Sequence, residues 1–356
     1  MPNEVLRSFI QKLFYFLLLA CLWFSAYSQS ETNQLLDKLQ LNQALYPPES
    51  ILSTKSIVLL SVPEVSDRSE WMILVDELQQ FLAEEGIDAV AYIEVEPLFS
   101  IPNTVLAIPA FLNEREIQNV ILFAAKDEDS PIFLAMGPYN QKASFFDKSS
   151  TFWARYSSKL APVTSELRTY FKTGELYRDN LLVNESPEFF YSKVELGIVA
   201  KSIPPSLAEF KVYVEPINES LFEELGPASF RYENLFEEKA FKQRLKDRNY
   251  MITALATDTT NNISFKDLTK TNQVLRKEGF QYELMFVSGV DTKVYEWLPF
   301  PDRQKPSGKI IHKFYLNDLR NNNIYVGKAW DASVDWSKAM SSFLAQMNEV
   351  IQEKSN

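Results

Sequence analysis

Carboxylates are the only side chains with catalytic chemistry that this sequence supplies in quantity. Glu94 and Glu96 stand two residues apart near the carboxyl end of a predicted strand, so they share one of its faces. Asp127 follows the next predicted strand, and Asp258 follows the corresponding strand in the second half of the chain. Ligands of open α/β sheets dock at the carboxyl ends of strands. Two of these four carboxylates facing one pocket would suit acid–base cleavage of a glycoside, or would hold a hard cation such as Ca²⁺.

The same four residues also fit an ordinary acidic surface. The chain contains 47 Asp and Glu residues and has a formal charge of −11, so acidic side chains at loop ends are common. Nucleic acids and anionic lipids are bound through clusters of Lys and Arg, and the sequence has no basic run. We therefore expect no nucleic-acid partner.

The other residue types exclude most alternative sites. Cys21 is the only cysteine and His312 is the only histidine, which leaves too few ligands or bases for a multi-histidine zinc site or a Ser-His-Asp triad in its usual form. The nine glycines form no phosphate-binding loop. We therefore assign no cofactor-binding or metal-binding residue and expect no cofactor. His312 is expected to pack on the apolar face of its strand with one ring nitrogen hydrogen-bonded.

The elements that must position these carboxylates alternate between short apolar strands and helices, as is typical of α/β proteins. In the first half, Trp71, Leu74, Leu78 and Leu82 recur at helical spacing behind a capping box that begins at Asp67. The predicted strands lie at 57–62, 89–95, 120–125 and 132–136, and the predicted helices at 67–86, 105–117 and 152–171, with Pro162 breaking or starting part of the last one.

The second half repeats that order. We predict strands at 210–214, 251–257 and 282–287, helices at 235–248 and 268–277, a loop at 294–307, a hairpin of 309–316 with 324–326, and a last helix from Ser333. The fold class is therefore α/β, with two similar three-layer-type β-α-β-α-β-β-α domains. Internal duplication explains the repeat, and convergence on one common wiring is the alternative. The domains are expected at 51–177 and 207–356, after an N-terminal helix (33–45) and linker at 29–50 and around a linker at 178–206.

The stretch from Lys309 to Trp336, KIIHKFYLNDLRNNNIYVGKAWDASVDW, is the most distinctive in the chain. It resembles the C-terminal hairpin and helix of uncharacterised exported two-domain α/β proteins of Bacteroidetes-type bacteria. The resemblance covers this stretch well and the rest loosely, and it implies neither an activity nor a functional residue. From the residues themselves, we expect Asp331 or Ser333 to cap the last helix, and Trp330 with Trp336 to fix that helix to the sheet.

The first residues predict export. Arg7 and Lys12 precede an apolar run at 13–25, which is shorter than the roughly 20 residues of a membrane-spanning helix. Small residues at 26–28 then predict a signal peptide of residues 1–28 and a mature chain that starts at Gln29. An uncleaved anchor and a lipoprotein attached through Cys21 are the alternatives. Cleavage leaves no cysteine, and no later segment is long and apolar enough to span a membrane.

These observations favour a periplasmic binding or assembly protein. Catalytic residue types are scarce, whereas aromatic residues, which are enriched in protein interfaces, make up 13% of the chain. The expected partner is another envelope or outer-membrane protein. The alternatives are a carboxylate-dependent, glycoside-type hydrolase and a small-molecule receptor with an inter-domain cleft. The sequence does not indicate the partner, the ligand or the oligomeric state.

Overall fold

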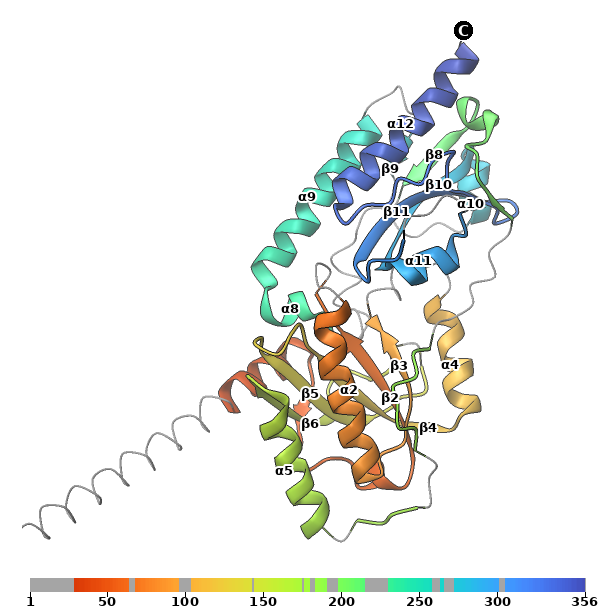
Figure 1. Cartoon of the computed structure of the whole chain (residues 1–356). Helices are drawn as coiled ribbons and strands as arrows, with labels where there is room; N and C mark the ends of the chain where they lie inside the picture. Colours follow the sequence, from red (N-terminus) through yellow and green to blue (C-terminus); the bar gives the residue numbers. More distant parts are fainter. Residues whose placement is uncertain are drawn as a thin grey trace, which may run out of the picture.

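A computed structural model shows a mixed α/β protein with two six-stranded sheets, one in each of two lobes (Figure 1). The structure describes residues 29–63, 68–95, 104–142, 144–174, 176–179, 183–190, 198–214, 230–257, 263–265, 272–300 and 305–355. The predicted signal peptide, Asp67, Glu96 and Asp258 lie outside these residues. Within them, no helix combines the length and the apolar character needed to cross a membrane.

The first lobe is built on a sheet with the strand order β1-β6-β5-β4-β2-β3. Strand β5 runs antiparallel to both of its neighbours, β4 and β6, whereas β2 is parallel to both β3 and β4, and β1 is parallel to β6. The strands are β1 (Asn42–Gln43), β2 (Lys55–Ser61), β3 (Ala89–Glu94), β4 (Ile117–Ala124), β5 (Ile132–Pro138) and β6 (Thr151–Ser157). The helices are a first helix at 29–38, the 3₁₀ helix η1 (Glu49–Leu52), α2 (Arg68–Glu85), α4 (Thr104–Glu114) and α5 (Leu160–Thr173).

Helices cover both faces of this sheet, because β2 is apolar on both sides. Val58 and Leu60 pack with buried residues of α2 and α5 on one face, and Ile57 and Leu59 pack with those of α4 and the first helix on the other. A continuous apolar run is what a strand needs when it is buried on both faces. The first lobe therefore has three layers.

The second lobe repeats the strand order and the strand directions of the first. Its order is β7-β12-β11-β10-β8-β9, with β10 and β11 antiparallel, β11 and β12 antiparallel, and the remaining pairs parallel. The strands are β7 (Val199–Ala200), β8 (Lys211–Val214), β9 (Ile263–Phe265), β10 (Phe280–Val290), β11 (Ile310–Asp318) and β12 (Ile324–Tyr325). The helices are η2 (Pro205–Ala208), α8 (Tyr232–Phe236), α9 (Glu238–Thr257), α10 (Asn272–Lys277), α11 (Asp291–Trp297) and α12 (Trp336–Ser355).

Corresponding helices lie on corresponding faces of the two sheets. In the second lobe, buried residues of η2, α9 and α12 share one core, just as those of η1, α2 and α5 do in the first lobe. Figure 1 shows α9 and α12 side by side on that face. Residues of α11 contribute to a second core on the opposite face, and Leu275 of α10 lies in a third, smaller cluster.

The prediction of a helix at 152–171 is wrong in its first part, because residues 151–157 form strand β6. Phe152, Trp153 and Ala154 are all buried, and Phe152 packs on the opposite face from Trp153. That alternation is the period of a strand. The helix α5 begins only at Leu160, which places Pro162 in its first turn, where a missing backbone donor is tolerated.

Three further predicted elements differ from the structure. The predicted strand at 251–257 is the last part of α9, in which Phe241, Leu245 and Ile252 are buried four and seven residues apart, a helical spacing. The predicted loop at 294–307 begins inside the helix α11, whose Val294 and Tyr295 pack on the sheet. The predicted helix at 33–45 covers 29–38 instead, and β1 follows it.

Candidate functional site

The structure places two of the four candidate carboxylates on different strands of the first lobe. Glu94 is the last residue of β3 and is buried beside Leu60 of β2. Asp127 lies in the turn after β4, where its Oδ1 accepts a hydrogen bond from the backbone N–H of Asp129 at 3.1 Å. Because β2 lies between β3 and β4, the two backbones are separated by about 10 Å. Glu96 and Asp258 lie outside the described residues, so the convergence of the four carboxylates on one pocket stays a prediction.

Residues of the second lobe cover the carboxyl ends of the parallel strands. Ser61 ends β2, and its hydroxyl oxygen accepts a hydrogen bond from the backbone N–H of Tyr232 at 2.7 Å. Phe230 and Tyr232 belong to the same buried core as Ala124, the last residue of β4. Phe230 and Tyr232 therefore cover the ends of β2 and β4, at the edge of the sheet where α/β proteins usually bind ligands.

Tyr232 is held in this junction by hydrogen bonds of both its backbone N–H and its side-chain hydroxyl group. Its hydroxyl group forms a hydrogen bond with Ser130, which follows β4. Burial is the main cause that raises the pKa of Tyr232 to about 12; the nearby carboxylates of Glu237, Asp127 and Glu233 act in the same direction, and the Ser130 hydrogen bond opposes the rise. The phenol is therefore neutral at physiological pH and acts as a structural contact.

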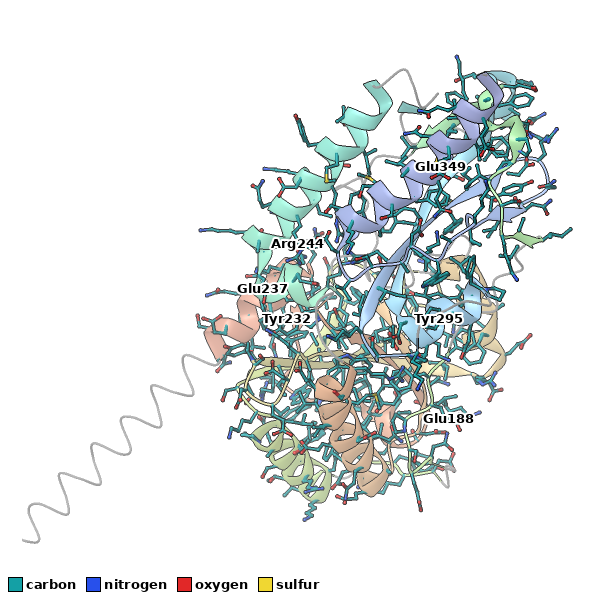
Figure 2. All side chains as sticks on the ribbon, turned by 45° about the horizontal axis from the view of Figure 1, so that its top comes forward. Glu188, Tyr232, Glu237, Arg244, Tyr295 and Glu349 are labelled. Atoms are coloured by element: carbon teal, nitrogen blue, oxygen red, sulfur yellow. The ribbon has the colours of Figure 1, made fainter. Side chains whose placement is uncertain are left out.

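Other contacts join the two lobes at the same place. The backbone N–H of Arg68 donates to the carbonyl oxygen of Gly308 at 3.1 Å, and Val290 and Ile310 extend the core that contains α2. On the other side, Lys38 of the first helix pairs with Glu238 of α9 at 3.2 Å, and within the second lobe the buried Glu233 of α8 pairs with Arg244 of α9 at 3.4 Å. Figure 2 shows Tyr232 and Arg244 in this region, with Glu188 well away from both.

The structure contains a cavity at the opposite edge of the first sheet, near the amino ends of β2 and β3. Its volume is about 330 Å³. It is lined by two cationic side chains, two carboxylates, one amide and five apolar or aromatic side chains: Lys55, Arg115, Asp88, Glu188, Asn184, Val90, Ala91, Phe111, Phe189 and Phe190. The sequence analysis did not single out this cavity.

One wall of the cavity comes from residues 183–190, which the sequence analysis placed in a linker. The N–H of Tyr92 donates to the carbonyl oxygen of Glu188 at 2.7 Å, and the N–H of Phe190 donates to the carbonyl oxygen of Tyr92 at 2.8 Å. The Gln79 side chain of α2 donates to the carbonyl oxygen of Asn184 at 2.6 Å and accepts from the Tyr92 hydroxyl at 2.8 Å. The segment is therefore an extra edge of the first sheet, fixed by backbone pairing.

The charged groups of the cavity are held apart by its walls. Asp88 precedes β3 and is 6% exposed. Burial raises the pKa of its carboxyl group, and the positive charge of Lys55 opposes that rise. Arg115 lies 4.0 Å above the ring of Phe111, which stacks on Phe190 with ring centroids 3.8 Å apart. The cavity thus offers a desolvated carboxylate, two cations and an aromatic wall.

The second lobe contains the most deeply buried charges of the described chain. Lys313 of β11 is 0% exposed, and its ammonium group lies 2.6 Å from a carboxylate oxygen of Asp331. Burial lowers the pKa of Lys313 to about 8, while the attraction of Asp331 opposes that change. Gln346 of α12 donates to the other oxygen of Asp331 at 2.6 Å. This pair links β11 to α12 through the segment between them.

This geometry corrects the predicted cap of the last helix. Asp335, and neither Asp331 nor Ser333, caps α12, because its Oδ1 accepts hydrogen bonds from the N–H groups of Ser337 at 2.8 Å and Lys338 at 3.2 Å. Asp331 instead forms the ion pair with Lys313. The side chain of Ser333 accepts from the N–H of Asp335 and so supports the cap.

The two tryptophans of this stretch pack in different places. Trp336 packs edge-on against Phe286 and Phe314, as expected for a residue that fixes α12 to the sheet. Trp330 packs instead against Tyr295 of α11 and against Phe300. The stretch therefore connects elements on both faces of the sheet.

His312 is a packed side chain, as the sequence analysis expects. It is 2% exposed, and its Nδ1 lies 2.7 Å from the hydroxyl oxygen of Ser288 on β10. Among the described residues, no three His, Cys, Asp or Glu side chains are arranged to hold a metal ion. Comparison of the chain with protein families, with curated proteins and with solved structures finds no match. The geometry alone must therefore support any functional proposal.

Proposed function

We propose that this chain is an exported binding or assembly protein that acts through contacts with another protein of the cell envelope. The coverage of the carboxyl ends of β2 and β4 by residues 230–236 supports binding over catalysis, because the usual substrate position of the first sheet is occupied. A cleft between the lobes is also disfavoured, since Tyr232 and Arg68 tie the lobes together there.

Exposed apolar side chains at equivalent edges of the two sheets carry the proposal. Leu45 and Tyr46, which follow β1, are 79% and 62% exposed, and Ile198, which precedes β7, is 72% exposed. β1 and β7 are the first strands in the order of their respective sheets. Exposed large apolar residues beside a sheet edge are a feature of protein interaction sites.

Affinity capture from an envelope fraction tests this proposal. The mature chain, starting at Gln29, is the bait, and a variant with Leu45→Ser and Ile198→Ser is compared with it. The control is Tyr250→Ser on α9, because Tyr250 is 77% exposed but lies far from both edges in sequence. We expect one envelope protein to be captured by the mature chain and the control and lost from the double variant. Equal capture by all three baits would contradict the proposal.

Export is tested separately by N-terminal sequencing of the protein from its native cell. A periplasmic product that begins at Gln29 supports the cleaved signal peptide. A product that carries lipid on Cys21 would replace it with the lipoprotein alternative. An intact chain in the cytosol would contradict both.

We also infer that the two lobes arose by internal duplication. Their six-stranded sheets share one order and one set of directions, and η1 and η2 occupy the same position before the first central strand of each sheet. A pair of prolines accompanies both 3₁₀ helices, Pro47-Pro48 before η1 and Pro204-Pro205 at the start of η2. An experimental structure in which the lobes differ in strand order would contradict this inference.

A further inference from the structure

We propose that the cavity at the amino ends of β2 and β3 binds a small zwitterion, specifically an apolar α-amino acid. In this arrangement Asp88 receives the ammonium group, Lys55 and Arg115 attract the carboxylate, and the apolar wall receives the side chain. This site goes beyond the protein contacts proposed above and does not depend on them.

Asp88 provides the strongest support. Its side chain is largely buried, and no group of the described chain donates a hydrogen bond to its carboxylate, whose oxygens are open to the cavity. A carboxylate on a cavity wall that has no hydrogen-bond partner in the protein can pair only with water or with a ligand group. Because this carboxylate lines the cavity, an ammonium group is the ligand group that it fits best.

The two cations of the cavity supply the complementary charge. Lys55 influences the Asp88 carboxyl group through its charge, but the two side chains do not approach within the 4.0 Å of an ion pair. Arg115 extends over the ring of Phe111, which fixes its guanidinium group near the cavity. A ligand that carries both an ammonium and a carboxylate group can pair with both sets of charges, whereas a simple cation or anion leaves one set unpaired.

The volume and the apolar lining of the cavity determine the size and the side-chain type of the ligand. The cavity measures about 330 Å³, at the small end of the range of ligand pockets. Val90, Phe111 and Phe190 provide a surface for an aliphatic or aromatic side chain. The wall at 188–190 is fixed by the two hydrogen bonds of Tyr92, so the cavity is formed before the ligand arrives.

Calorimetric titration of the mature full-length chain with three related compounds tests the proposal. L-leucine carries both charges, L-leucinamide lacks the carboxylate, and N-acetyl-L-leucine lacks the ammonium group. We expect L-leucine to bind with a dissociation constant between about 1 µM and 1 mM, and each of the other two to bind at least about tenfold more weakly. N-acetyl-L-leucine binding as tightly as L-leucine would overturn the proposal, and so would no binding of either L-leucine or L-phenylalanine.

Two variants assign the charges to residues. Asp88→Asn is expected to weaken L-leucine by about tenfold or more and to have little effect on N-acetyl-L-leucine. Lys55→Met is expected to weaken L-leucine while leaving L-leucinamide unchanged. Glu77→Gln on the exposed side of α2 is the control and should bind like the unaltered chain. Unchanged L-leucine affinity in both Asp88→Asn and Lys55→Met would refute the assignment, and thermal melting of each variant verifies that it is folded.

Discussion

The two lobes share one wiring, but they use buried polar groups differently. In the first lobe, Tyr92 and Gln79 form neutral hydrogen bonds that attach residues 183–190 to the sheet, and a cavity lies beside that attachment. In the second lobe, the ion pair of Lys313 and Asp331 joins β11 to α12. The hydrogen bonds of Tyr92 and Gln79 hold residues 183–190 in place and leave the cavity beside them open. The ion pair of Lys313 and Asp331, in contrast, is removed from water and enclosed by packed side chains. The comparison indicates a binding role for the first lobe and a clamping role for the second.

Removing one member of the ion pair should have the largest effect. Lys313→Met leaves Asp331 buried without its cation, and we expect the free energy of unfolding to fall by about 3 to 5 kcal/mol. Urea unfolding followed by circular dichroism measures this change. Lys313→Met combined with Asp331→Leu should recover most of the loss, because no unpaired charge remains. A single variant as stable as the unaltered chain would show that the pair is not a clamp.

The junction between the lobes should respond next. Ser61→Ala removes the acceptor of the buried Tyr232 N–H, which we expect to cost about 1 to 3 kcal/mol. Because the junction is weakened, the two lobes should unfold in separate steps, which calorimetry resolves. Ser341→Ala on α12 is the matched control, since its hydroxyl group bonds only to its own helix. One unchanged transition in Ser61→Ala would contradict the coupling of the lobes.

The pH dependence of stability separates the buried ion pair from the junction between the lobes by its sign. The pKa of Lys313 in the folded chain, about 8, is below the ordinary lysine value of 10.5, so the unfolded chain binds more protons between these two pH values. The free energy of unfolding should therefore rise with pH in that window, by at most about 1.4 kcal/mol per pH unit. Tyr232, raised to about 12, contributes stability that is lost as pH rises from 10 toward 12. Urea unfolding at several pH values checks both slopes, and the rise should be absent in Lys313→Met.

A substitution in the wall of the cavity should change the free energy of unfolding least. Tyr92→Phe removes the hydrogen bond to Gln79 while keeping the ring, so the free energy of unfolding should fall by only about 0.5 to 1.5 kcal/mol. Limited proteolysis should nevertheless cut residues 183–190 faster than in the unaltered chain. An unchanged cutting rate would indicate that the backbone pairing and the Gln79–Asn184 hydrogen bond hold the wall without the Tyr92 hydroxyl group.

The spacing of apolar residues along the sequence correctly predicted elements such as α2, in which buried residues recur at a regular interval. Trp71, Leu74 and Leu78 indicate α2, and Gly86, which has a φ of +78°, ends it as expected. Residues 152–157 were misassigned because their short apolar stretch is followed, after only a few polar residues, by the apolar face of α5. In a short apolar run, helix and strand cannot be told apart without the neighbouring strand β5.

The candidate site was less predictable for a different reason. The sequence analysis looked for carboxylates at strand ends, whereas Asp88 precedes a strand and becomes unusual only through its burial. The wall at 183–190 has no strand pattern of its own, and its position depends on hydrogen bonds to Tyr92 and Gln79, which lie about a hundred positions earlier in the chain. The Pro-Pro pairs before η1 and within η2 were a usable signal for the matching lobes.

Hydrogen–deuterium exchange of the mature chain with and without saturating L-leucine tests the division of roles between the lobes most directly. We predict that the ligand slows exchange at residues 88–91 and 184–190 and leaves residues 230–236 and the sheet of the second lobe unchanged. Slower exchange at 230–236 or in the second lobe, with none at 88–91, would contradict the account.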